Sequence, residues 1–262
     1  MKKLYSFLFA ILLFLGCATN PLTGKNTMAF VSNRTLFPMS FSQYDEFLKE
    51  NTVITNTEEA DMVIRVGGRI AEAARKWLTA EGQPNYLNDY RWEYNLVSDN
   101  TVNAWCMPGG KIVVYTGILP VTQTETGLAV VMGHEVAHAL LNHGQQRMSA
   151  NVLQQLGAVT LSIFTDSDLI MAAYGLGSTL LGTLPFSREH ESEADRYGLI
   201  LMAIAGYDPS EAVPFWERMA AMSGGGTLEF LSTHPSSNTR IRRLREWTPE
   251  AKQKAAGFGV QF

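Results

Sequence analysis

Residues 134–138 read His134-Glu135-Val136-Ala137-His138, and this stretch decides which fold and site the chain can form. At 3.6 residues per turn, the two imidazoles project from the same face of a helix. Both can therefore reach one tetrahedral metal ion, while Glu135 is directed at water on that ion. The spacing predicts two zinc ligands and a catalytic base. An ordinary buried helix is the alternative, and it is disfavoured because the chain has only 5 histidines.

A third ligand is needed, because catalytic zinc has three protein ligands and one open position. Ser187 is a good helix N-cap, and residues 189–205 have apolar positions at helical spacing before Gly206. On this second helix Glu191 and Asp195 share a face. One of them can bind zinc while the other accepts a hydrogen bond from the far nitrogen of a ligating histidine. We therefore expect one Zn²⁺ per chain.

His143 is a rival ligand, and its spacing argues against it. It lies nine residues after His134, which is about 900° of helix and half a turn off the metal-binding face. Gly144 follows immediately. This pattern predicts that His143 occupies the last turn of the zinc helix, with Gly144 as its left-handed C-cap.

With these segments in place, the chain resembles metallopeptidase family forty-eight, the gluzincin group of HtpX-, BepA- and LoiP-like zinc metalloproteases. The resemblance covers roughly residues 90–245. It rests on His134 to His138, on Ser187-Arg-x-x-Glu191-x-x-Ala-Asp195, and on residues 102–117 and 233–241.

The resemblance implies a ligand set and roles. It places zinc on His134, His138 and Glu191, a general base at Glu135, and a supporting role behind a ligand at Asp195. These roles agree with the spacing argument, which by itself leaves the choice between the two carboxylates open.

The resemblance also implies roles for residues outside the zinc motifs. His234 is expected near the zinc, either as a fourth ligand of a latent state or as a donor during the reaction. Arg240 is expected to hold an oxyanion or a structural carboxylate. Asn103 and Ala104 resemble the edge strand on which gluzincins bind extended substrates, although Asn103 also suits a turn.

Hydrophobic periodicity predicts an α+β fold that is mainly helical, with a small β-sheet and hairpin beside the zinc helix. The resemblance implies that this fold is a zincin (gluzincin) domain. The expected elements are helices over 43–50 and 58–80, from about Glu125, from 211 to about 222 and over 238–247, and strands over 91–97, 102–107 and 111–116.

The N-terminus predicts an export signal. Two lysines precede an uncharged stretch that is too short to span a bilayer, and Cys17 follows it, as in a bacterial lipobox. Simple secretion and an uncleaved anchor are the alternatives. The expected division is a signal peptide over 1–16, a lipoprotein tether over 17–40, the metallopeptidase domain over 41–247 and a tail over 248–262.

Composition limits the partners. The formal net charge is −4 with no basic run, so nucleic acid is not expected as a partner. If Cys17 carries a lipid, Cys106 is the one remaining thiol and no intramolecular disulfide forms. Residues 145–186 are apolar and glycine-containing, and we expect a helical cover over the site rather than a membrane hairpin.

These features together predict a zinc-dependent endopeptidase anchored by lipid in the periplasm at the outer membrane. Its substrates would be misfolded or unassembled envelope proteins, and its partners the membrane and the envelope assembly machinery. The alternatives are a chaperone-like assembly lipoprotein whose zinc site is latent, and a zinc-dependent esterase or amidase that acts on cell-wall material.

Overall fold

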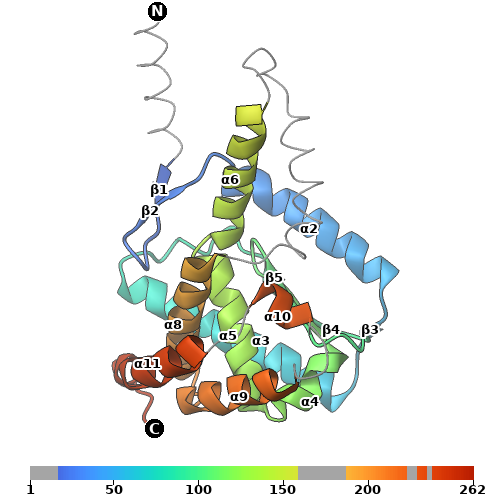
Figure 1. Cartoon of the computed structure of the whole chain (residues 1–262), viewed down its shortest axis with the longest axis vertical. Helices are drawn as coiled ribbons and strands as arrows, with labels where there is room; N and C mark the ends of the chain where they lie inside the picture. Colours follow the sequence, from blue (N-terminus) through green and yellow to red (C-terminus); the bar gives the residue numbers. More distant parts are fainter. Residues whose placement is uncertain (1–16, 159–186, 223–228, 235–237) are drawn as a thin grey trace, which may run out of the picture.

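The computed structural model describes residues 17–158, 187–222, 229–234 and 238–262 (Figure 1). The helices are α2 (Asn33–Glu50), α3 (Glu58–Ala80), α4 (Leu119–Thr122), α5 (Glu125–Leu140), α6 (His143–Ala158), α8 (Arg188–Ile204), α9 (Ala212–Met222), α10 (Glu229–Thr233) and α11 (Asn238–Ala256), with the 3-10 turns η1 (Thr116–Ile118) and η2 (Pro209–Glu211). The strands are β1 (Cys17–Thr19), β2 (Asn26–Met28), β3 (Val53–Ile54), β4 (Glu93–Val97), β5 (Ala104–Met107) and β6 (Lys111–Tyr115).

Strands β3 to β6 form a four-stranded sheet in the order β3-β4-β6-β5. β5 and β6 are the predicted hairpin, and β4 pairs parallel with β6. Side chains alternate across the sheet: Ile112 and Val114 belong to the main core with α3 and α5, whereas Val113 packs with Tyr44 of α2. The sheet therefore lies between α2 and the helical core, and β5 forms its edge.

Helix α5 runs through the centre of the helical part (Figure 1). Thr124 caps its N-terminus by accepting a hydrogen bond from the backbone N–H of Gly127, and every residue from Gly127 to Leu140 is buried. A helix that is buried all round must bring its polar side chains to partners inside the protein. The expected fold class, a mainly helical α+β domain with a small sheet beside the zinc helix, is confirmed.

Two glycines set the distance between α5 and α8. A Cβ atom added at Gly198 would lie 2.9 Å from the backbone nitrogen of His134, and one added at Gly133 would lie 2.9 Å from the carbonyl oxygen of Gly198. Only glycine permits this approach at both positions. Gly198 follows Glu191 and Asp195 on the same face of α8, so the crossing brings both carboxylates to His134.

The predicted position of His143, in the last turn of the zinc helix, is wrong, although His143 is not among the candidate metal ligands that the structure groups together. Helix α5 ends at Leu140, and α6 begins at His143 after a turn in which Asn142 has a φ of 57°. Gly144 therefore lies inside α6 and caps nothing. The expectation that His143 points away from the zinc-binding face assumed one continuous straight helix. It does not apply, because the chain turns between the two helices.

Two helices are longer than their sequence pattern indicates. Helix α2 begins at Asn33, ten residues before the predicted start, and includes Pro38. Helix α11 continues past Trp247 and through Pro249 to Ala256, and its Ala251 and Ala255 are buried in the core. Each helix thus contains a proline, and the burial of neighbouring residues outweighs the lost hydrogen bond.

The N-terminal segment packs on the corner between α5 and α6. The side chain of Asn20 donates a hydrogen bond to the carbonyl oxygen of Leu140 at 2.9 Å, and the side chain of Gln145 donates one to the carbonyl oxygen of Val31 at 2.9 Å. Helix α2 crosses the expected boundary at 40/41 and α11 crosses that at 247/248. The four-part division of the chain stays a prediction.

Three predictions concern residues, or in one case a side chain, that the structure does not describe. They are the signal peptide over 1–16, the lipid on the Cys17 side chain, and most of the cover expected over 145–186, of which α6 is described. No helix within the described ranges is both long enough and apolar enough to cross a bilayer.

Candidate metal centre

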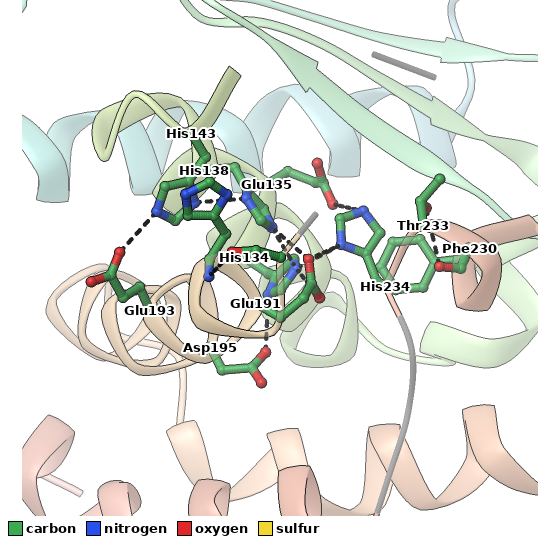
Figure 2. Close-up of polar contacts among 12 residues, drawn as sticks. His134, Glu135, His138, His143, Glu191, Glu193, Asp195, Phe230, Thr233 and His234 are labelled. Carbon is green, nitrogen blue, oxygen red and sulfur yellow. Dashed lines mark hydrogen bonds and ion pairs between the residues drawn. The ribbon is translucent and has the colours of Figure 1, made fainter. Parts of the chain in front are cut away.

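Helix α5 brings His134 and His138 together as their spacing predicts. Their Nε2 atoms lie 3.0 Å apart, and both side chains are buried (Figure 2). Because the two residues are separated by four positions, local helix geometry alone accounts for this approach.

Helix α8 supplies the carboxylates, and Ser187 caps it as expected by accepting a hydrogen bond from the backbone N–H of His190. Glu191 Oε1 lies 3.3 Å from Nε2 of His138. Asp195 lies on the other side of His134, with Oδ1 3.0 Å from Nδ1. The structure therefore brings Glu191 into the histidine cluster and Asp195 behind a histidine.

His234 completes a group of four. It follows α10, and its Nδ1 atom is 3.1 Å from Nε2 of His134 and 2.9 Å from Oε1 of Glu191. Within the described ranges, His134, His138, Glu191 and His234 form the one group of candidate metal ligands, and their ligand atoms all lie within 4.8 Å of one another. All four residues are buried.

The donor atoms of this group fit one zinc ion. Neighbouring ligand atoms of a tetrahedral zinc site are about 3.3 Å apart, and the closest distances here run from 2.9 to 3.6 Å. The Asp195 carboxylate only accepts hydrogen bonds, so it places the proton of neutral His134 on Nδ1 and leaves a lone pair on Nε2. Lone pairs and a carboxylate that converge in this way repel one another unless a cation lies between them.

The charged side chains of the cluster shift one another's pKa values. Burial alone would raise the pKa of Glu191, but His234, His138 and His134 hold it well below its usual range. Burial opposes protonation of His234, yet Glu135 and Glu191 raise its pKa. Burial lowers the pKa of His138 far below the ordinary value, which favours the neutral imidazole that a metal requires.

Glu135 lies beside this cluster at a cleft along β5. Its Oε1 atom is 3.4 Å from Nε2 of His234. Burial raises the pKa of Glu135, although His234, His134 and a hydrogen bond from the Cys106 backbone oppose the shift. Oε1 is buried and has no hydrogen-bond partner within the part of the chain that the structure describes. Such an oxygen is suited to accept a proton from a molecule that enters the cleft.

Arg240 of α11 contacts the carboxylates of the cluster. Nη2 donates to Asp195 Oδ1 at 2.7 Å and to Glu191 Oε2 at 3.0 Å, and Nη1 donates to the carbonyl oxygen of His234 at 3.2 Å. The guanidinium lies over the ring of Trp216, 3.5 Å from its centroid. Of the two expected roles, these contacts favour the holding of structural carboxylates.

The edge strand forms one wall of the cleft. The backbone N–H of Tyr115 on β6 donates to the carbonyl oxygen of Asn103. In antiparallel pairing, successive residues of a strand direct their backbone groups alternately toward and away from the partner strand. The backbone groups of Ala104 and Cys106 therefore point away from β6, toward the outer edge of the sheet. The Asn103 side chain donates to Glu229 Oε1 at 3.1 Å. The cleft is also lined by Phe47, Trp105, Met107, Tyr115, Glu135, His138, Gln145, Arg147 and His234.

Sequence reasoning missed several residues around the site. His143 contacts His138, Glu193 contacts His143, and Trp216 supports Arg240. For His143 a signal was present, because Asn142 is one of the residues that tolerate the left-handed conformation in which a helix breaks. The positions of Glu193 and Trp216 depend on how distant helices pack.

A buried cluster of two histidines and a glutamate on crossing helices, with a second glutamate beside an edge strand, defines a metallopeptidase site. Residues 68–248 match peptidase family M48, and the chain belongs to this family. The predicted family, the class of zinc metallopeptidase and zinc as the cofactor are confirmed.

Three relatives illustrate the similarity. The chain is 41% identical over 174 residues to mitochondrial metalloendopeptidase OMA1 of Schizosaccharomyces pombe, covering 64% of this chain and 50% of the relative. It is 36% identical over 197 residues to OMA1 of Saccharomyces cerevisiae, covering 71% and 54%. It is 28% identical over 196 residues to metalloprotease YcaL of Escherichia coli, covering 69% and 73%. The chain thus spans about half the length of the mitochondrial relatives.

These relatives overturn the predicted location. Lipid anchoring in the periplasm at the outer membrane is contradicted, because the relatives matched at 41% and 36% identity are mitochondrial, whereas the bacterial YcaL is matched at 28%. The prediction relied on a short apolar stretch that ends in a cysteine. Such a pattern is much less specific than similarity over a whole domain.

Proposed function

We propose that this chain is a zinc endopeptidase in which His134, His138 and Glu191 hold the metal and Glu135 is the general base. One observation carries the proposal: three ligand atoms from two helices converge beside a buried carboxylate that opens on a cleft. A purely structural zinc site needs no such base.

The chemistry divides between the metal and the protein. When bound, zinc supplies Lewis-acid chemistry that lowers the pKa of water and polarises a carbonyl group. Glu135 takes the proton of the attacking water and delivers it to the leaving nitrogen. The raised pKa of Glu135 suits this exchange, because a base must also release its proton within the same cycle. Asp195 and Arg240 keep His134 and Glu191 in place.

The cleft favours an extended polypeptide as the substrate. The backbone groups of Ala104 and Cys106 face the outer edge of β5, where the N–H of Ala104 now donates to Asn103 Oδ1 and the Cys106 backbone to Glu135. A substrate strand can pair with this edge in their place, and such pairing binds main chain and tolerates many sequences. Phe47, Trp105, Met107 and Tyr115 line the same cleft and offer contacts to apolar side chains. Extended segments with exposed apolar side chains are typical of misfolded or unassembled proteins, so we assign the enzyme a role in protein quality control.

His234 supports a second, latent state. A catalytic zinc keeps one position open, yet here Nδ1 of His234 lies among the ligand atoms, 2.9 Å from Glu191 Oε1 and 3.1 Å from His134 Nε2, and would occupy that position. In this arrangement the site is closed, and His234 must withdraw before a substrate binds. The contact of His234 with the ligand group also supports one alternative function, a chaperone-like protein whose zinc site is permanently closed.

Hydrolysis of casein by the zinc-loaded chain, measured with its zinc content, tests the proposal. We expect cleavage that a chelator removes and added zinc restores. The His234→Ala variant should retain zinc and cleave faster than the wild type. One zinc per chain without cleavage in either protein would reject the peptidase and support the permanently closed site. Slower cleavage by His234→Ala at unchanged zinc content would reject the latent state and support a donor role.

A further inference from the structure

His143, whose spacing argues against a role as a zinc ligand, lies directly behind the ligand His138. His143 Nδ1 is 2.9 Å from Nδ1 of His138, on the side of that ring opposite the ligand atom Nε2 (Figure 2). The His143 side chain has no exposed surface. The turn at Asn142 creates this contact, because it starts α6 with His143 pointing back at the end of α5.

A carboxylate and a lysine continue the chain of contacts to the surface. Nε2 of His143 lies 3.0 Å from Oε2 of Glu193 on α8, and Oε1 of Glu193 lies 2.6 Å from Nζ of Lys25. The ring of His190 stacks on His143 at a centroid distance of 4.2 Å and an interplanar angle of 16°. His143 is therefore held in its plane as well as at its two nitrogens.

These contacts determine where the protons lie. Glu193 only accepts hydrogen bonds, so His143 presents its N–H at Nε2. A neutral imidazole has one N–H, and Nδ1 of His143 is then an acceptor. His138 must donate to it from its own Nδ1, which leaves the lone pair of His138 on Nε2, the atom that faces Glu191 and His134.

The two histidine ligands are thus oriented in different ways. Asp195 contacts His134 directly, at 3.0 Å, whereas Nδ1 of His138 meets another histidine. Glu193 acts on His138 through His143. A carboxylate behind a ligating histidine fixes the tautomer of the ring and makes it a better ligand.

We propose that His143 is a positioning residue that fixes His138 in its metal-binding tautomer, with Glu193 and Lys25 setting the orientation of His143. This inference rests on the zinc site of the proposed function. It also connects the N-terminal segment to the metal, because Lys25 immediately precedes β2 and reaches α8.

Zinc affinity in competition with a chelator tests the proposal on the full chain. His143→Leu removes both hydrogen bonds and should weaken zinc binding by about 10- to 100-fold. His143→Gln should retain more of the affinity, because an amide supplies one acceptor and one donor. If the His143→Leu variant fails to fold, the His143→Gln variant still tests the proposal.

Glu193 and Glu189 provide a matched pair. Both accept a hydrogen bond from Lys25 at 2.6 Å, but only Glu193 contacts His143. Glu193→Gln should weaken zinc binding in the same direction as His143→Leu, whereas Glu189→Gln should leave it unchanged. Equal effects of the two substitutions would overturn the proposal, since they would show that Lys25 acts independently of the histidine chain.

The tautomers can be observed directly. Long-range ¹H–¹⁵N spectra of the zinc-loaded wild type, which has 5 histidines, should show the proton of His138 on Nδ1 and that of His143 on Nε2. Any other arrangement overturns the proposal, as does unchanged zinc affinity in a folded His143→Leu variant. If the wild type itself binds no zinc, the proposed function fails as well. If the wild type binds zinc and His143→Leu binds it with the same affinity, only the positioning role fails.

Discussion

The close crossing of α5 and α8 makes Gly198 the position where the smallest change should have the largest effect on the site. In Gly198→Ala, the new Cβ would lie 2.9 Å from the nitrogen and 3.0 Å from the Cα atom of His134. Carbon contacts are optimal at about 3.5–4.0 Å, so the helices must separate by about 0.5 Å or more. The obstacle is backbone and cannot rotate away, and overpacking of this kind costs about 1–3 kcal/mol.

Gly68 in α3 is the matched control, because a Cβ added there meets no atom within 4 Å. Both alanines gain about 0.5–1 kcal/mol of helix propensity over glycine, so this gain cancels between the variants. In urea unfolding of the zinc-free chain, Gly68→Ala should be stabilised. Gly198→Ala should lie about 1–3 kcal/mol below it and should also bind zinc more weakly, since Glu191 moves with α8. Equal stabilities for the two variants would refute the reasoning.

Three further results are expected. Arg240→Met leaves the buried carboxylates of Glu191 and Asp195 without their shared cation, so the free energy of unfolding of the zinc-free chain should fall by about 3–5 kcal/mol; a fall below about 1 kcal/mol in urea unfolding would contradict the assigned contacts. Glu191→Gln should stay folded but lose zinc on equilibrium dialysis, and full zinc retention would exclude this residue as a ligand. The hydrogen bond from Arg65 lowers the pKa of Glu125 from its ordinary value of 4.5, so the stabilisation by Glu125 is present above that pH and is lost as the pH falls through the lower folded-state pKa. The difference in melting temperature between the wild type and Glu125→Gln should therefore shrink on acidification below pH 4.5, and a difference that grows would reject the contact.

The parts of the site that follow from local geometry could be predicted from the sequence. His134 and His138 meet because they are one helical turn apart, Ser187 caps α8, and the hairpin of β5 and β6 follows from its glycine turn. In each case the relevant partners are within about ten residues, where backbone geometry leaves few alternatives.

The parts that depend on distant packing could not be predicted in the same way. Spacing alone did not decide between Glu191 and Asp195 as the ligand, because the answer depends on the α5–α8 crossing at Gly198. His143 was misplaced because one residue, Asn142, breaks a helix whose composition would let it continue. Trp216 under Arg240 has no local signal at all.

The most direct test of the central claim is a comparison of the wild type with Glu135→Gln, in casein hydrolysis with zinc measured in the same samples. The amide keeps the size of the carboxylate but cannot take a proton. The account predicts unchanged zinc content, an unchanged fold and a loss of about 10²- to 10⁴-fold in the cleavage rate. Undiminished cleavage by the zinc-loaded variant would contradict it.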